Sequence, residues 1–199
     1  MDDWFERQFA DTRVMVIMRG LDADASLALA ERVWAAGVRM VEIPIQTPAA
    51  VEALRVVAAA ARGRGLVVGA GTVVSVDHVD AARDAGAAYT VSPGADEEVV
   101  RASLDAGLPT LPGVATATDI QRCARLGVRW LKAFPASTLG PGWITAMHGP
   151  FPGARFVATG GVDVGNAGEF LAAGARAVSL GSALADPGQL AALSPLVGR

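Results

Sequence analysis

Two kinds of segment alternate along most of the chain. Short runs of apolar and β-branched residues are separated by longer Ala-, Arg- and Glu-rich segments, in which apolar residues recur at helical spacing. A glycine stands between most helical segments and the run that follows, where a helix C-terminus often needs positive φ. These glycines are Gly37, Gly65, Gly86, Gly107, Gly127, Gly153 and Gly174. The pattern predicts repeated helix–strand units.

Eight apolar runs have the length and composition of buried strands. The predicted strands cover residues 14–18, 38–44, 66–70, 88–92, 109–112, 128–134, 155–159 and 177–180. Near-continuous apolar strands are typical of a parallel sheet that is buried on both faces.

The intervening segments predict helices with recognisable N-caps. They cover residues 23–36, 48–62, 76–85, 96–106, 118–126, 164–173 and a shorter stretch at 143–148. The expected capping residues are Asp22, Thr47, Ser75, Thr116 and Asp163. Between residues 134 and 152 the glycines and prolines predict a long functional loop, interrupted only by that short helix.

Strand–helix alternation with short connections implies parallel strands joined by right-handed crossovers. Eight such units favour a single-domain (β/α)8 barrel over residues 1–199, with an additional N-terminal helix at about residues 2–10. An open doubly wound sheet is the alternative, and such sheets often carry G-x-G-x-x-G after the first strand. Arg19 and Gly20 stand there instead, which favours the barrel.

The composition excludes several classes of partner. The 199 residues are 52% hydrophobic and 19% charged, with a net charge of −3 and no basic stripe, so we expect no nucleic-acid partner. No apolar run approaches the roughly 20 residues of a membrane span. The single cysteine, Cys123, cannot form an internal disulfide, which suits a reducing compartment. We expect a cytoplasmic protein.

One charged residue type is almost missing. Of 17 Lys and Arg residues only Lys132 is a lysine, which biased codon usage alone could explain. Its position is more informative, because Lys132 and Glu42 are each a lone charge inside an apolar predicted strand, where burial is costly. Their strands, the sixth and second, face each other across an eight-stranded barrel. A buried salt bridge is one interpretation, and a lysine nucleophile with a carboxylate proton shuttle is the other.

The second interpretation is chemically consistent. Desolvation lowers the pKa of a buried lysine, and Arg19 at the end of the first strand would lower it further, while Glu42 would oppose both. A neutral amine attacks a ketone and gives a protonated imine. Glu42 could relay protons during dehydration and start carbon–carbon cleavage by removing a hydroxyl proton.

Further candidates stand at the C-terminal ends of the predicted strands, where barrel enzymes carry their active sites. They include Thr72, Pro93 and Phe134 after the third, fourth and sixth strands. The seventh and eighth strands end in Thr159-Gly160-Gly161 and Gly181-Ser182, at the usual phosphate-binding position of barrels. The two histidines and Cys123 show no metal-ligand spacing, so we expect neither a metal nor another cofactor.

These motifs together resemble the KDPG/KDPGal aldolase family, in order from about residue 14 to residue 183. The residues that carry the resemblance are Val41-Glu-Ile-Pro-Ile, Gly69-Ala-Gly-Thr-Val, Ser92-Pro-Gly, Pro112-Gly-Val-Ala-Thr-Ala-Thr, Leu131-Lys-Ala-Phe-Pro-Ala-Ser, Thr159-Gly-Gly-Val and Leu180-Gly-Ser. The resemblance implies a cofactor-free class I aldolase on a (β/α)8 barrel, usually a homotrimer. Such enzymes cleave a phosphorylated 2-keto-3-deoxy sugar acid to pyruvate and glyceraldehyde 3-phosphate.

The resemblance also implies residue roles. Lys132 matches the Schiff-base lysine and Glu42 the proton-transfer glutamate. Thr72 matches the position that binds the pyruvate carboxylate, and Gly161 and Ser182 match the phosphate site. Arg19 aligns with a substrate-binding arginine of the KDPGal branch.

The closer likeness is to that branch, 2-dehydro-3-deoxy-6-phosphogalactonate aldolase, but two positions point in opposite directions. Gln46 stands where the KDPG branch has arginine, whereas Thr159 matches the KDPG branch, since the KDPGal branch tends to have valine there. The resemblance places this position near the C4 hydroxyl, where the two substrates differ in configuration. The C4-epimer enzyme, KDPG aldolase, is therefore an alternative. More remote alternatives are a sugar-phosphate epimerase or isomerase and a non-catalytic sugar-phosphate-binding barrel.

Overall fold

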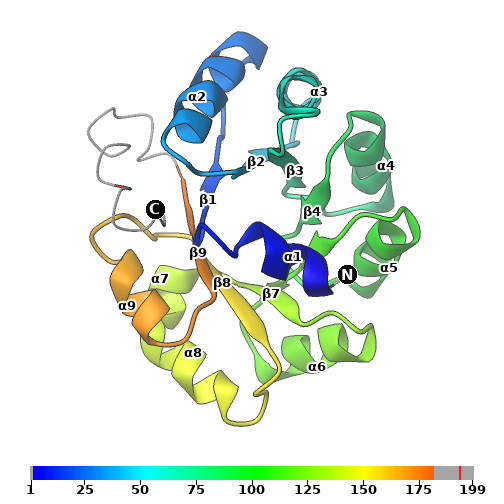
Figure 1. Ribbon diagram of the computed structural model, residues 1–199. Coiled ribbons are helices and arrows are strands. Elements are labelled where there is room, and N and C mark those ends of the chain that lie inside the picture. Colours follow the sequence, from blue (N-terminus) through cyan, green and yellow to red (C-terminus); the bar gives the residue numbers. More distant parts are fainter. Residues whose placement is uncertain (1, 182–192, 194–199) are drawn as a thin grey trace.

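The computed structural model describes residues 2–181 and residue 193, and its strands form one continuous parallel sheet (Figure 1). In sequence order the strands are β1 (Val14–Ile17), β2 (Met40–Pro44), β3 (Val67–Gly71), β4 (Tyr89–Val91), β5 (Thr110–Leu111), β6 (Gly113–Val114), β7 (Trp130–Ala133), β8 (Arg155–Thr159) and β9 (Ala177–Leu180). Their order in the sheet is β5-β4-β3-β2-β1-β9-β8-β7-β6. The eight predicted strands are all present.

The sheet closes at Pro112. β5 and β6 lie on either side of this residue, and β5 pairs with β4 while β6 pairs with β7. Proline has no backbone N–H, so the ladder is interrupted there, but the Pro112 carbonyl accepts a hydrogen bond from the Lys132 N–H at 2.9 Å. The predicted fifth strand is thus one segment divided in two, and the (β/α)8 barrel is confirmed.

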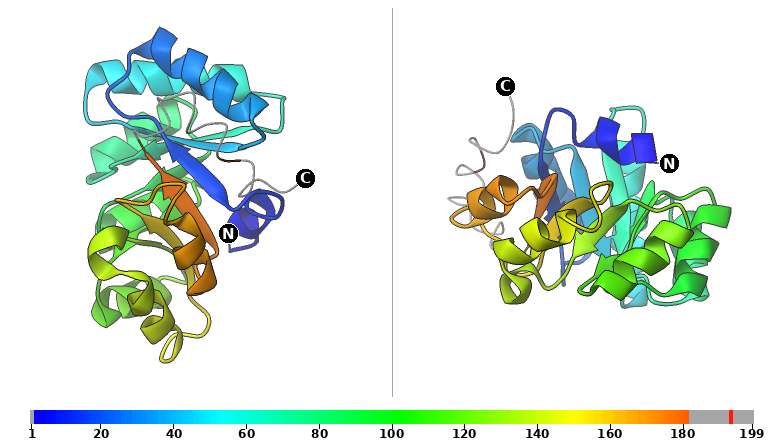
Figure 2. Two further views of the ribbon diagram at one scale, coloured as in Figure 1. Left: turned by 90° about the vertical axis from the view of Figure 1, so that its left-hand side faces the viewer. Right: turned by 90° about the horizontal axis from the view of Figure 1, so that it is seen from below.

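Helices surround the barrel (Figures 1 and 2). They are α1 (Asp2–Gln8), α2 (Ala23–Ala35), α3 (Pro48–Ala61), α4 (Val76–Asp84), α5 (Glu97–Asp105), α6 (Ala117–Arg125), α7 (Ala136–Leu139), α8 (Pro141–His148) and α9 (Ala167–Ala172). The side chains of Asp22, Thr47, Ser75 and Thr116 accept N-cap hydrogen bonds as expected. No helix in the described part of the chain is long and apolar enough to cross a membrane.

Two local predictions were wrong. Asp163 does not cap a helix at residue 164, because α9 begins only at Ala167 after Asn166. The Asp163 carboxylate instead accepts hydrogen bonds from the N–H groups of Gly165 and Asn166, which closes a turn before the helix. Gly153 also differs from the other six glycines, which all have positive φ. It lies in the loop between α8 and β8 and does not end a helix.

The strand register arranges the inward-facing side chains in levels. The pairing register can be followed from Glu42 on β2 to its partner on β3, and so on from strand to strand, with β5 and β6 taken as one strand. After one full circuit the register returns to β2 at position 34 instead of 42, a displacement of eight residues along the strand. A shear of about eight is characteristic of (β/α)8 barrels. Neighbouring strands are therefore offset by about one residue, and inward side chains of alternate strands lie at one level.

The N-terminal end of the barrel is filled with large side chains and covered by α1 (Figure 2). Met40, Tyr89, Trp130 and Ala177 form one level near the N-terminal ends of the strands by this register. Phe5 of α1 packs on them, with its ring centroid 5.9 Å from that of Tyr89 and 5.7 Å from that of Trp130. The helix expected at about residues 2–10 is thus a plug for this end of the barrel.

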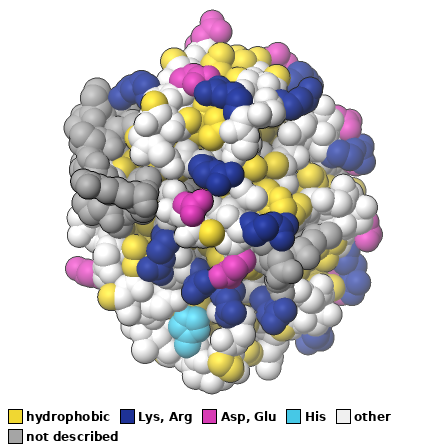
Figure 3. Space-filling view, in the orientation of Figure 1, with side chains coloured by type: hydrophobic (Ala, Val, Ile, Leu, Met, Phe, Trp, Pro, Cys, Tyr) yellow, Lys and Arg dark blue, Asp and Glu magenta, His cyan; other side chains and the backbone are white. Residues whose placement is uncertain are grey.

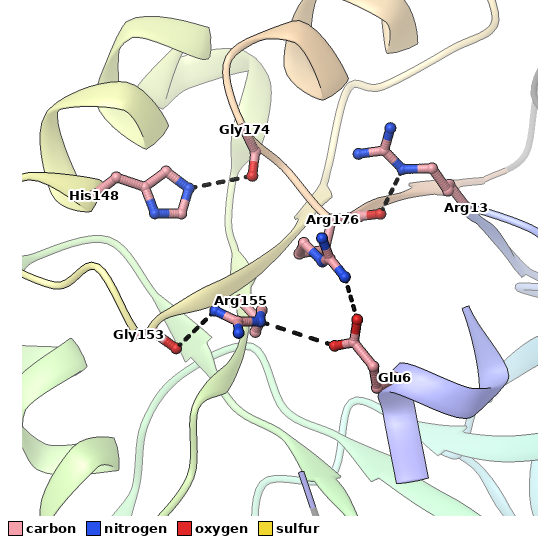
Figure 4. A network of polar contacts seen from close by, with 7 residues as sticks. All are labelled: Glu6, Arg13, His148, Gly153, Arg155, Gly174 and Arg176. Carbon is pink, nitrogen blue, oxygen red and sulfur yellow. Dashed lines mark hydrogen bonds and ion pairs between the residues drawn. The ribbon is translucent and has the colours of Figure 1, made fainter. Parts of the chain in front are cut away.

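Polar contacts also hold α1 in place. Glu6 forms ion pairs with Arg155 and Arg176, which stand at the beginning of β8 and just before β9 (Figure 4). Arg13 donates its Nε hydrogen to the Arg176 carbonyl at 2.9 Å. Figure 3 shows basic side chains interleaved with a few acidic ones across this face. The N-terminal end of the barrel is closed by both aromatic packing and ion pairs.

Candidate active site

Glu42 and Lys132 lie at one level inside the barrel. By the register described above, this level consists of Glu42 on β2, Val91 on β4, Lys132 on β7 and Ser179 on β9. Glu42 and Lys132 therefore come from opposite walls, as the sequence predicted, and Val91 and Ser179 occupy the two walls between them.

Two glycines stand at the next level towards the C-terminal ends of the strands. This level consists of Ile17, Gly71, Gly113 and Thr159, so two of its four members have no side chain. A β-carbon added at Gly71 would overlap the Glu42 carboxyl group, and one added at Gly113 would overlap the Pro93 carbonyl. Glycine at these positions therefore makes room for the Glu42 carboxyl and for the backbone at Pro93.

The space above this level is a cavity of about 530 Å³ at the C-terminal end of the barrel. The structure brings most of the predicted site residues to its wall. They are Arg19, Thr72, Pro93, Lys132, Phe134, Thr159, Gly160, Gly161 and Gly181. Glu42 is not part of the cavity wall and lies one level below Gly71 and Gly113. Ser182 lies outside the described residues.

Lys132 is held in an environment that favours its neutral form. Its side chain is 5% exposed, and Nζ lies 4.7 Å from the centroid of the Phe134 ring. Burial lowers the pKa of the Lys132 ammonium group, and the positive charge of Arg19 lowers it further, while the negative charge of Glu42 opposes both. A neutral amine with a free electron pair is the form of lysine that attacks a carbonyl carbon.

Glu42 is shifted towards its neutral form as well. The residue is 1% exposed, and its Oε2 has no hydrogen-bond partner among the described residues. Burial raises the pKa of the Glu42 carboxyl, against the opposing charges of Lys132 and Arg19. A static salt bridge would satisfy both groups, but no hydrogen bond or ion pair joins them in the described part of the chain. This geometry favours a proton-transfer pair.

A hydrogen bond joins the residues that follow β1 and β2, Arg19 and Gln46. Arg19 donates a hydrogen bond from its guanidinium group to the side-chain oxygen of Gln46. Two strands away, Thr72 follows β3 with φ of 56°, an uncommon conformation for a β-branched residue. Backbone strain of this kind is concentrated at ligand-binding sites. Arg19 and the strained Thr72 thus line the cavity from the ends of β1 and β3.

The glycine turn after β8 is fixed by its neighbours. Gly160 and Gly161 have φ of 92° and 70°. The Ser137 N–H donates to the Gly160 carbonyl at 2.9 Å, and the Asn166 side chain donates to the Gly161 carbonyl at 3.0 Å. Ser137 belongs to α7, a one-turn helix in the segment that the sequence predicted as a long loop. The expected loop is therefore shorter, and its first turn supports the glycine pair.

Four residues of the cavity wall were not predicted. They are Ile17, Val162, Asp163 and Ser179. Ser179 lies two residues after Ala177 on β9 and therefore on the same face of the strand, so strand parity alone would have placed it inside the barrel. The signal was available but weak, because serine is common in strands of every kind.

Other chemically active side chains do not gather. Cys123 is buried in α6, and burial raises the pKa of its thiol to about 12. His148 lies in α8 against the Gly174 carbonyl. Within residues 2–181, no three His, Cys, Asp or Glu side chains are grouped as they would be to hold a metal ion.

Comparisons with known proteins identify the family. Residues 5–193 match the aldolase family described as KDPG and KHG aldolase. A protein of Rhizobium meliloti named probable 2-dehydro-3-deoxy-6-phosphogalactonate aldolase is 35% identical, over 89% of this chain and 84% of its own. The 2-dehydro-3-deoxy-phosphogluconate aldolase of Pseudomonas aeruginosa is 37% identical, over 81% and 73%.

A solved structure agrees with these sequence relatives. KDPG aldolase from Legionella pneumophila, with pyruvate captured as a covalent carbinolamine intermediate, superposes with a TM-score of 0.86 and 27% identity over 96% of this chain and 97% of that one. Neither an epimerase nor a non-catalytic barrel is needed to explain the fold and the buried pair. The chain belongs to the KDPG and KHG aldolase family of carbon–carbon lyases.

Proposed function

We propose that this protein is a class I aldolase that cleaves 2-dehydro-3-deoxy-6-phosphogalactonate to pyruvate and D-glyceraldehyde 3-phosphate, with Lys132 as the Schiff-base lysine. One observation carries the proposal. Lys132 is a buried amine of lowered pKa at the base of a cavity, level with a buried carboxyl of raised pKa. A lysine nucleophile and a proton shuttle require this combination.

In the first stage, the neutral Lys132 Nζ attacks the C2 ketone and gives a carbinolamine. The Glu42 carboxyl donates a proton to the departing hydroxyl, water leaves, and a protonated imine remains. Glu42 is then ionised close to the imine cation, so the charges that form are paired inside the barrel.

In the second stage, the Glu42 carboxylate removes the proton of the C4 hydroxyl. The C3–C4 bond breaks, its electron pair moves to C3 and into the imine, and glyceraldehyde 3-phosphate leaves. Protonation of the resulting enamine at C3 and hydrolysis of the imine release pyruvate and restore the amine. The water lost in the first stage is regained here, so the reaction needs no cofactor.

The cavity wall supplies binding groups for both ends of this substrate. Arg19, held by Gln46, is the cation available for the C1 carboxylate, with Thr72 on the same side of the reaction. The N–H groups of Gly161 and Gly181 suit the phosphate, and Ser182, which the family resemblance assigns to the same site, lies outside the described residues. Pro93 and Phe134 bound the space between these two ends.

Borohydride trapping tests the role of the lysine. Incubation with pyruvate and sodium borohydride should reduce the imine and leave a carboxyethyl group on Lys132, located by peptide mass spectrometry. Pyruvate without borohydride is the control. Failure to find any adduct under forcing conditions would exclude Lys132 as the nucleophile.

KDPG aldolase is the second candidate, and Thr159 is the observation in its favour. Relatives with the galactonate and gluconate names are matched at 35% and 37% identity, so they support both epimers about equally. Measurement of kcat/KM on both C4 epimers distinguishes the two. A strong preference for the gluconate-derived substrate would overturn the galactonate assignment.

We also propose a homotrimer acting in the cytoplasm. The trimer follows from the family resemblance, and the compartment from a chain with one buried cysteine and no disulfide. Light scattering coupled to size-exclusion chromatography should give three times the mass of the chain. A monomer across the working concentration range would exclude the trimer.

A further inference from the structure

Ser179 occupies the wall between the two reacting groups. On β9 it is the ladder partner of Thr159 on β8 and of Met15 on β1. The register sets it level with Lys132 on one side and Glu42 on the other. It contributes to the same cavity as Lys132 and Thr159.

The Ser179 hydroxyl has no partner in the part of the chain that the structure describes. The residue is 1% exposed, and its Oγ makes no hydrogen bond among the described residues. Buried hydroxyl groups are usually satisfied by a hydrogen bond within the protein, as when the Thr90 hydroxyl donates to the Ser103 hydroxyl at 3.0 Å. An unsatisfied buried hydroxyl is destabilising, and alanine would avoid that penalty at no cost in packing. A serine retained at this level is explained if a ligand satisfies it.

At the level that holds Glu42 and Lys132, the residue opposite Ser179 is apolar. Val91 faces Ser179 across this level and is fully buried. A substrate bound to Lys132 therefore has hydroxyl groups on one side, from Ser179 with Thr159 one level above, and the apolar Val91 side chain opposite Ser179. The two C4 epimers direct their hydroxyl groups to opposite sides of the carbon chain.

We infer that Ser179 is a substrate-binding residue whose hydroxyl hydrogen-bonds to the C4 oxygen and selects the configuration at C4. The inference rests on the proposed aldolase reaction and deepens it. The epimer whose C4 hydroxyl points to the Ser179 wall gains a hydrogen bond and remains within reach of Glu42. Its epimer places that hydroxyl against Val91, where it is desolvated without a partner.

Ser179→Ala tests the inference through the ratio of kcat/KM on the two epimers. We expect a loss of about 10-fold on the preferred epimer and little change on the other, since one buried hydrogen bond is removed from one substrate only. Pyruvate has no C4 hydroxyl, so trapping of the Lys132–pyruvate imine by borohydride should proceed as in the wild type.

Ser26→Ala is the matched control, because Ser26 is equally buried, also has a hydroxyl without a partner among the described residues, and lies in α2, which does not line the cavity. It should leave the epimer ratio unchanged, and both variants should keep or slightly raise the melting temperature. Two outcomes for Ser179→Ala would overturn the role of Ser179 but leave the aldolase reaction standing. One is an unchanged ratio of kcat/KM on the two epimers, and the other is an equal loss on both epimers and on imine trapping. A wild-type protein that forms no pyruvate imine would overturn the proposed aldolase reaction itself.

Discussion

The two ends of the barrel differ in how their interior is packed. At the N-terminal end, Tyr89 and Trp130 fill one level and α1 adds Phe5 on top of them. Even the Tyr89 hydroxyl is satisfied there, since it donates to the Val41 carbonyl at 2.8 Å. This end is closed by packed aromatic rings.

At the C-terminal end the corresponding positions are small or unpartnered. Gly71 makes room for the Glu42 carboxyl, and within the described part of the chain the Glu42 Oε2 and the Ser179 hydroxyl have no hydrogen-bond partner. The difference indicates that stability and chemistry are separated along the barrel axis. Substitutions at one end should change folding without changing turnover, and substitutions at the other end should do the reverse.

The largest effect is expected from Lys132→Arg. Arginine keeps the charge but cannot form an imine at neutral pH, so aldol cleavage should fall by about 10⁴-fold or more. The steady-state cleavage rate measures the loss, and circular dichroism should show an unchanged fold. Turnover near the wild-type value would point to chemistry that uses the cavity without an imine.

Phe5→Ala should give the largest loss of stability without loss of chemistry. Removing a buried aromatic ring from the plug costs about 3–5 kcal/mol in the free energy of unfolding. Urea denaturation measures this cost. Well below the melting temperature, kcat/KM should stay close to the wild-type value, and a parallel collapse of activity would mean that the two ends are coupled.

Gly71→Ala should affect mainly activity. The added methyl group overlaps the Glu42 carboxyl and displaces it, so cleavage should fall by roughly 10- to 100-fold, with about 1–3 kcal/mol lost from overpacking. Gly94→Ala is the control at the same end of the barrel, because a β-carbon at Gly94 meets no atom within 4 Å. Equal losses in both variants would contradict the assigned cause.

The smallest effect is a pH-dependent gain in stability for Glu42→Gln. Burial raises the pKa of Glu42, so above the unfolded value of about 4.3 the native wild type retains a proton that the unfolded chain has lost. Wild-type stability therefore falls as pH rises through this window, and the variant escapes that loss. Thermal melts should show an advantage of the variant that grows as the pH rises from about pH 4. An advantage independent of pH would show that the Glu42 pKa is not raised.

The fold could be predicted because its signals are local. Helical spacing, N-caps and C-terminal glycines each depend on a few adjacent residues, and they placed all eight barrel strands. The errors arose where a distant contact decides the outcome. Asn166 bonds back to Gly161 and delays α9, and Ser137 packs under Gly161 and orders the expected loop.

The site could be predicted only in part for the same reason. Glu42 and Lys132 were conspicuous as charges within apolar strands. Ser179 was not conspicuous, because only the barrel register places it level with Glu42 and Lys132. That register offsets neighbouring strands by about one residue, and a single strand's sequence does not reveal it. The contact between Arg19 and Gln46 likewise joins the ends of two strands, and no pattern within either strand reveals it.

The single lysine has a practical consequence for handling the protein. Every other basic side chain of the Lys and Arg set is an arginine, which acylating reagents do not modify at neutral pH. An amine-reactive dye therefore has only the terminal amine and Lys132 as targets. Dye incorporation at Lys132 should titrate vacant cavities directly, and pyruvate should protect against it. Coupling to an amine-reactive surface through that same lysine would inactivate the enzyme.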